Sequence, residues 1–176
     1  PIEIFRVGSD ATTSSLSDTG SLSGLATQVN GSIILNVLSG NLAAVSDVVT
    51  SGSGNLLLNV AAGTVDIDGA IQTETGNISV LASGSVALSA ASVTRTITGT
   101  IDIQSGADIQ LLDGSELVSN GGDIRVEAVD NIVLSSINAA TGNILVISTA
   151  GDLLDGGDTD RDLVASGLIL SIAGTS

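Results

Sequence analysis

The stretch GNLLLNV at residues 54–60 recurs as GNISVLA at residues 76–82. Looser copies of the same phrase begin at Gly31, Gly99, Gly122, Gly142 and Gly167. Each copy is a glycine, a small polar residue and then alternating aliphatic residues, and the copies follow one another about every 23 residues. Such a period indicates a stack of similar structural units, each too small to bury its apolar face alone.

The aliphatic residues alternate within each phrase, which is the pattern of a β-strand with one buried face. A second strand is expected eight or nine residues after the first, and a third strand follows at a less regular distance. The expected inward residues of the second strands are Leu42, Val65, Val86, Ile109, Ile132 and Leu153, and the third strands are expected around Val48, Ile71, Val93, Leu117 and Ile137. We therefore predict an all-β fold, a parallel β-helix (β-solenoid) of about seven coils with about 23 residues per coil.

The residue after each corner glycine is small and polar. In stacked coils these residues would form a ladder in which side chains bond the backbone of the neighbouring corner. The predicted ladder consists of Ser32, Asn55, Asn77, Thr100, Asp123 and Asn143. The alternative fold is a β-sandwich, but sandwich cores usually contain a Trp or Tyr, and Phe5 is the one aromatic residue of this chain.

Composition restricts the function. Nineteen Asp and Glu residues against four Arg give a net charge of −15, which argues against nucleic acid as a partner because phosphate contacts require clustered cations. No apolar stretch approaches the ~20 residues of a membrane-spanning helix, so membrane insertion is not expected. The chain has no His, Lys, Cys or Tyr, so nucleophilic triads cannot be assembled. We expect no enzymatic activity.

Two groups of acidic residues are candidate sites. Asp155, Asp158, Asp160 and Asp162 resemble the start of a calcium loop, but Leu163 stands where glycine is needed. The loop is a candidate Ca²⁺ site, and the alternative is a solvated turn in which Arg161 offsets part of the charge. No other cofactor is expected.

Carboxylate pairs on strands form the second group, and they invite comparison with β-helical glycoside hydrolases. The pairs are Asp66/Asp68 and Asp102/Asp123. Sugar clefts usually present aromatic side chains, so outward acids on a solenoid face explain these residues adequately.

The sequence divides into residues 1–30, an N-terminal strand with a Ser/Thr/Gly-rich junction, and residues 31–176, the solenoid repeats. Neither end shows the pattern of an amphipathic capping helix, so we expect open ends that join head to tail with copies of the same unit. Joining is covalent in a tandem array or occurs by strand addition. The alternative is an arbitrary boundary in an ordinary longer solenoid. The expected junction residues are Ile2, Ile4, Phe5, Val7, Leu168, Leu170 and Ile172.

The phrases GDLLDGGDTDRDLVA at 151–165 and SGLILSIAG at 166–174 resemble β-helical repeats of giant bacterial surface proteins, the filamentous-haemagglutinin-like adhesins. The resemblance covers most of residues 31–176 and implies a secreted, cell-surface protein with an adhesive or structural role. We therefore expect a structural repeat unit of an extracellular fibre. The alternative is an adhesin-type binding module that contacts a surface through loops 8–30 and 152–162.

Overall fold

The structure is a computed structural model that describes residues 12–16, 20–22, 24–157, 159 and 161–174. All regular structure in these residues is β-strand. In chain order the strands are β1 (Thr12–Leu16), β2 (Gly20–Leu22), β3 (Leu25–Ala26), β4 (Ile33–Val37), β5 (Leu42–Ala44), β6 (Val48–Val49), β7 (Leu56–Val60), β8 (Val65–Ile67), β9 (Ala70–Gln72), β10 (Ile78–Ala82), β11 (Val86–Leu88), β12 (Val93–Thr96), β13 (Ile101–Ser105), β14 (Ile109–Leu111), β15 (Glu116–Ser119), β16 (Ile124–Ala128), β17 (Ile132–Leu134), β18 (Ser136–Asn138), β19 (Asn143–Ser148), β20 (Leu153–Asp155), β21 (Leu163–Val164) and β22 (Gly167–Ile172).

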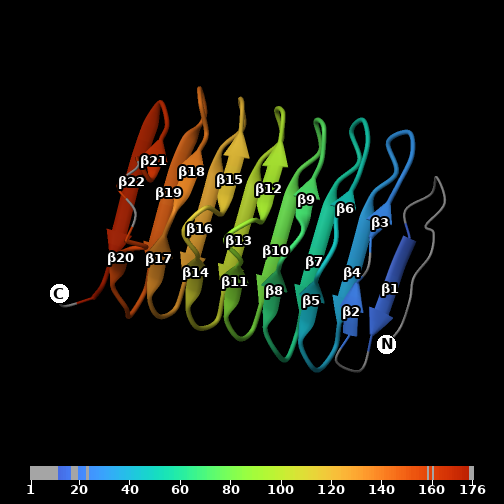
Figure 1. Ribbon diagram of the computed structural model, residues 1–176, viewed down its shortest axis with the longest axis horizontal. Coiled ribbons are helices and arrows are strands. Elements are labelled where there is room, and N and C mark those ends of the chain that lie inside the picture. Colours follow the sequence, from blue (N-terminus) through green and yellow to red (C-terminus); the bar gives the residue numbers. More distant parts are fainter. Residues whose placement is uncertain (1–11, 17–19, 23, 158, 160, 175–176) are drawn as a thin grey trace.

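The strands form three parallel sheets. One sheet has eight strands, in the order β1-β4-β7-β10-β13-β16-β19-β22, and the other two have seven strands each. Each coil gives one strand to each sheet, so the coils lie in a row with β1 and β22 at opposite ends (Figure 1). The predicted parallel β-helix of about seven coils is confirmed.

Strand register places equivalent residues of successive coils in columns. Ile78 pairs with Leu56 on one side and with Ile101 on the other, and all three side chains are buried. The intervening residues point outward, which reproduces the predicted alternation. The core is a stack of aliphatic layers, each residue covered by its equivalents in the coils before and after.

One third-strand position differs from the sequence pattern. A strand is present at Val93, but the residue aligned with the buried Ile71 and Leu117 is Thr94. Val93 is half-buried and pairs with Ala70 and Glu116. Hydrophobicity alone favours Val93 as the inward residue, whereas the register with both neighbouring coils places Thr94 inside.

The described part of the N-terminal segment belongs to the same stack. β1, β2 and β3 pair in parallel with β4, β5 and β6. The three sheets therefore extend to the N-terminal side of Gly31.

Glycine is required at five of the corners that precede a first strand. A Cβ atom on Gly99 would overlap the carbonyl oxygen of Gly76, the equivalent residue of the preceding coil. The same overlap with the preceding corner glycine would occur at Gly54, Gly76, Gly122 and Gly142. The recurrent glycine of the repeat therefore reflects close contact between stacked backbones.

Replacing Gly99 by alanine should destabilise the solenoid, because the backbone atoms that its Cβ would meet cannot move without disturbing two coils. We expect a loss of about 2 kcal/mol or more in unfolding free energy, measured by denaturant titration. Gly121→Ala is the matched control, since the nearest atoms to its Cβ lie 4.0 Å away. Equal stability of the two variants would contradict the close contact.

Replacing Thr94 by valine should stabilise the protein. The Thr94 hydroxyl is buried and has no hydrogen-bond partner, so its removal should raise the unfolding free energy by about 1 kcal/mol. Thr96→Val should do the opposite, because the Thr96 hydroxyl bonds the Gly76 carbonyl at 3.0 Å and the Gly99 N–H at 3.1 Å. Opposite shifts of the denaturation midpoint are the test, and shifts of the same sign would contradict this assignment.

Candidate functional site

The end of the solenoid formed by β20, β21 and β22 is the candidate site. Within the described residues each of these strands is the last of its sheet. β22 pairs with β19 through six residues, and no described strand pairs with its other edge. The backbone groups on that edge are therefore available to another strand.

Leu168 and Leu170 lie on this open end. They are aligned with Ile144 and Val146, whose side chains point inward and are buried. Leu168 and Leu170 nevertheless remain 49% and 46% exposed. Their exposure follows from the position of β22, because no described coil covers them.

The remaining apolar side chains of this end continue the core columns. Leu153 is aligned with the buried Ile132, and Leu163 with the buried Ile137. Leu153, Leu163 and Ile172 are partly buried and pack against the core. The end thus presents a cross-section of the solenoid interior.

The structure places three of the predicted junction residues, Leu168, Leu170 and Ile172, together on β22. The other four, Ile2, Ile4, Phe5 and Val7, lie outside the described residues.

The six residues of the predicted corner ladder also lie together. Oδ1 of Asn55 accepts the backbone N–H of Asn77 at 2.8 Å, and Oδ1 of Asn77 accepts that of Thr100 at 2.9 Å. The ladder also joins Ser32 to Asn55 and Asp123 to Asn143. No such bond joins Thr100 to Asp123 in the part of the chain that the structure describes. A side-chain-to-backbone hydrogen bond therefore joins successive corners at four of the five steps of the ladder.

A second ladder follows the next corner of each coil, and the sequence analysis did not find it. Oδ1 of Asn41 accepts the N–H of Thr64, and Oδ1 of Asp108 accepts that of Asn131. Oδ1 of Asn131 in turn accepts the N–H of Asp152 at 3.0 Å. Oδ1 of Asp152 is buried and has no hydrogen-bond partner among the residues that the structure describes. Gly174 of the next coil lies against this oxygen, so the described part of the ladder ends at Asp152.

A third polar column lies inside the solenoid and was also missed. Its hydroxyl groups bond the carbonyl oxygens of the corner glycines; for example, Thr50 Oγ1 donates to Gly54 O at 2.7 Å. The column consists of Thr27, Thr50, Thr73, Thr96 and Ser119. A signal for it exists in the sequence, because a Thr or Ser stands three or four residues before each of these corner glycines.

The acidic loop is described in part. Asp155 is exposed at the end of β20, and its Oδ1 accepts the N–H of Gly157 at 2.8 Å. The Asp162 carbonyl accepts the N–H of Ile137. Asp158 and Asp160 lie outside the described residues. Among the residues that are described, no group of three or more metal-ligating side chains is gathered.

The carboxylates considered for catalysis have other bonds or face solvent. Asp102 forms a bidentate ion pair with Arg125, at 2.8 and 2.9 Å, and these bonds raise the pKa of the Arg125 guanidinium above its ordinary value. Asp123 belongs to the corner ladder, and Asp66 and Asp68 are exposed.

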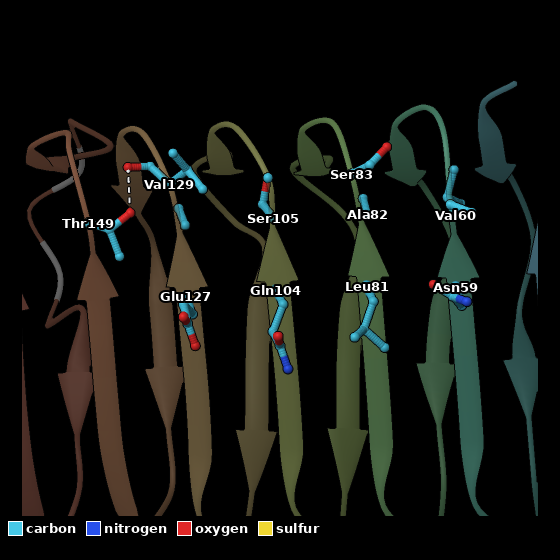
Figure 2. Close-up of a pocket in the computed structure, with 13 residues that line it drawn as sticks. Asn59, Val60, Leu81, Ala82, Ser83, Gln104, Ser105, Glu127, Val129 and Thr149 are labelled. Atoms are coloured by element: carbon cyan, nitrogen blue, oxygen red, sulfur yellow. Dashed lines mark hydrogen bonds between the residues drawn. The ribbon is translucent and has the colours of Figure 1, made fainter. Parts of the chain in front are cut away.

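A shallow groove of about 330 Å³ runs across the four strands β7, β10, β13 and β16, beside the first turn of the coils. Asn59, Leu81, Gln104 and Glu127 form a row along it, and the turns that carry Ser83 and Thr149 rise beside them (Figure 2). The row is a column of outward residues, so the groove follows from the regular bend of the coils.

The described residues contain no helix with the length and hydropathy needed to cross a bilayer. No family model, curated protein or solved structure matches this chain. The open end of the solenoid is therefore the feature on which a functional proposal must rest.

Proposed function

We propose that this chain is a structural repeat unit of an extracellular fibre, in which units join head to tail through the open ends of the solenoid. The observation that carries the proposal is the end formed by β20, β21 and β22. It combines unpaired strand edges with half-exposed Leu168 and Leu170 at inward positions. A further coil of the same shape would complete both.

Addition of a coil is favourable on two physical grounds. Its backbone would pair in parallel with the open edges, as each coil already pairs with the one before it. It would also cover the exposed leucines, and full burial of a Leu side chain is worth about 1.5–3 kcal/mol. Because each leucine is already about half-buried, covering it would contribute about 1 kcal/mol.

The partner we propose is another copy of the unit, linked covalently in a tandem array or added as separate subunits. The resemblance to secreted surface repeats is the basis for proposing an extracellular, cell-surface location. The mechanism is mechanical, because continuous parallel pairing along the axis makes a stiff rod. The acidic exterior, with a net charge of −15, keeps such rods soluble.

Electron microscopy of the native material should show filaments with an axial repeat. Seven coils at about 4.8 Å per coil give a repeat of about 34 Å, or about 38 Å with one further coil at the junction. Discrete particles that do not lengthen at any protein concentration would contradict head-to-tail joining and favour the binding-module alternative.

Replacing Leu170 by arginine should stop the purified chain from forming end-to-end assemblies, because the charge would be buried under the added coil. Ile169→Arg is the matched control: Ile169 is adjacent, 63% exposed and aligned with the outward-facing Leu145. We expect Ile169→Arg to assemble to the same length as the unmodified chain. Sedimentation velocity and negative-stain microscopy measure this, and equal lengths for all three proteins would refute the role of the open end.

A further inference from the structure

The outer face of the eight-stranded sheet carries little of the net charge of the chain. Among its strands, only β13 and β16 contain charged residues, which are Asp102, Arg125 and Glu127. The other acidic side chains described by the structure lie on turns or on the two smaller sheets. This face therefore contributes one net negative charge, against −15 for the whole chain.

The three charged side chains neutralise one another in part. Arg125 contacts Asp102 through Nε and Nη2, and it contacts Glu127 through Nη1 at 2.9 Å. Asp102 also accepts a hydrogen bond from Gln104 Nε2 at 2.9 Å. The result is a compact polar strip over the two neighbouring strands β13 and β16.

Half-buried aliphatic side chains lie on both sides of this polar strip. Leu57 on β7 and Leu81 on β10 lie on one side, and Leu145 and Ile147 on β19 lie on the other, followed by the exposed Ile169 on β22. All five are outward residues of their strands, since the residues that alternate with them are inward. Along the solenoid axis, this face therefore presents an aliphatic region, the polar strip and a second aliphatic region.

We propose that two copies of this chain pack face to face through the eight-stranded sheet, as antiparallel rods related by a two-fold axis that runs along the strands between β13 and β16. This rotation keeps the strand direction and reverses the order of the coils. Residues of similar or complementary chemistry then face each other, namely Asp102 with Arg125, Leu81 with Ile147, and Leu57 with Ile169.

Parallel rods would be matched less well. A two-fold axis along the solenoid would place each coil over the same coil of the second copy and reverse the strand direction. Leu57 would then face Asn59, Leu81 would face Ser79, and Ile169 would face Ser171. Three aliphatic side chains would each be buried against a polar one, whereas the antiparallel arrangement has one such mismatch, Leu145 against Ser79.

The area available is sufficient for weak association. Six strands at about 4.8 Å spacing, with five residues of about 3.3 Å each, cover about 500 Å² per copy. The total of about 1,000 Å² lies at the lower limit of specific interfaces. Burial of aliphatic side chains supplies the affinity, and the ion pairs mainly fix the alignment, because desolvation offsets most of their attraction.

The test uses the Leu170→Arg chain, so that end-to-end growth does not contribute. Its mass should double as concentration rises in sedimentation equilibrium. The doubling should require less protein at about 0.5 M salt than at about 0.05 M, because screening reduces the repulsion between two acidic rods. Added Leu81→Arg should weaken the pairing at least tenfold, because this arginine would lie against Ile147 of the second copy.

Ala87→Arg is the matched control, because Ala87 lies in the same coil, is half-buried and points outward from the neighbouring sheet. Pairing should be unchanged in this variant, which alters the net charge by the same amount. A single-chain mass at all concentrations, or equal loss in both arginine variants, would overturn the proposal. Neither result bears on end-to-end joining, which changes length rather than width.

The orientation of the rods can be tested separately. The chain has no cysteine, so single spin labels can be placed at Ser53→Cys and at Asn120→Cys. Ser53 precedes the corner of β7, far from the proposed two-fold axis, and Asn120 precedes the corner of β16, beside that axis. Antiparallel rods separate the two Ser53 labels by about five coils, or about 24 Å along the axis, and the Asn120 labels by about one coil. Equal distances for the two positions would indicate parallel rods and overturn the proposed symmetry.

Discussion

Parallel backbone pairing between successive coils is the constraint on which the rest of the structure depends. It fixes the spacing of the coils and places each side chain directly over its equivalent in the preceding coil. A residue type is therefore suitable at a position only if it can lie against itself or a close relative. Aliphatic residues satisfy this inside, glycine satisfies it at the tight corner, and asparagine satisfies it where a side chain bonds the next backbone.

The same constraint governs where charge is found. Like charges stacked at this spacing repel each other, so a charged column is unfavourable. The eight-stranded sheet avoids such a column by placing opposite charges in successive coils, since Asp102 lies opposite Arg125 in the next coil. Most of the remaining acids that the structure describes are on turns, where Asp47, Asp108 and Asp123 accept a backbone N–H of the next coil. A strongly acidic protein thus keeps one broad face that is almost neutral.

The sequence analysis predicted the coils because their period and the alternation within them are consequences of this stacking. It predicted the first corner ladder for the same reason, since Asn55 and Asn77 follow successive corner glycines. It did not find Thr94 as a core residue, because local hydrophobicity favours Val93 and only the register with both neighbours decides between them. The inward hydroxyl column was missed because a Thr beside a turn is usually interpreted as solvent-exposed. The nearly neutral face was missed because its residues are dispersed along the chain.

End-to-end joining and face-to-face pairing differ in the chemical groups that the chain offers for binding. At the open end, backbone groups and core side chains are presented together, so an added coil gains hydrogen bonds whose geometry every earlier coil already shows. On the outer face, the backbone groups of the strands from β4 to β19 are used within the sheet, and only side chains can bind. End-to-end joining should therefore be the stronger and more general interaction. Lateral pairing depends on the particular order of apolar and charged coils, which makes it the more selective one.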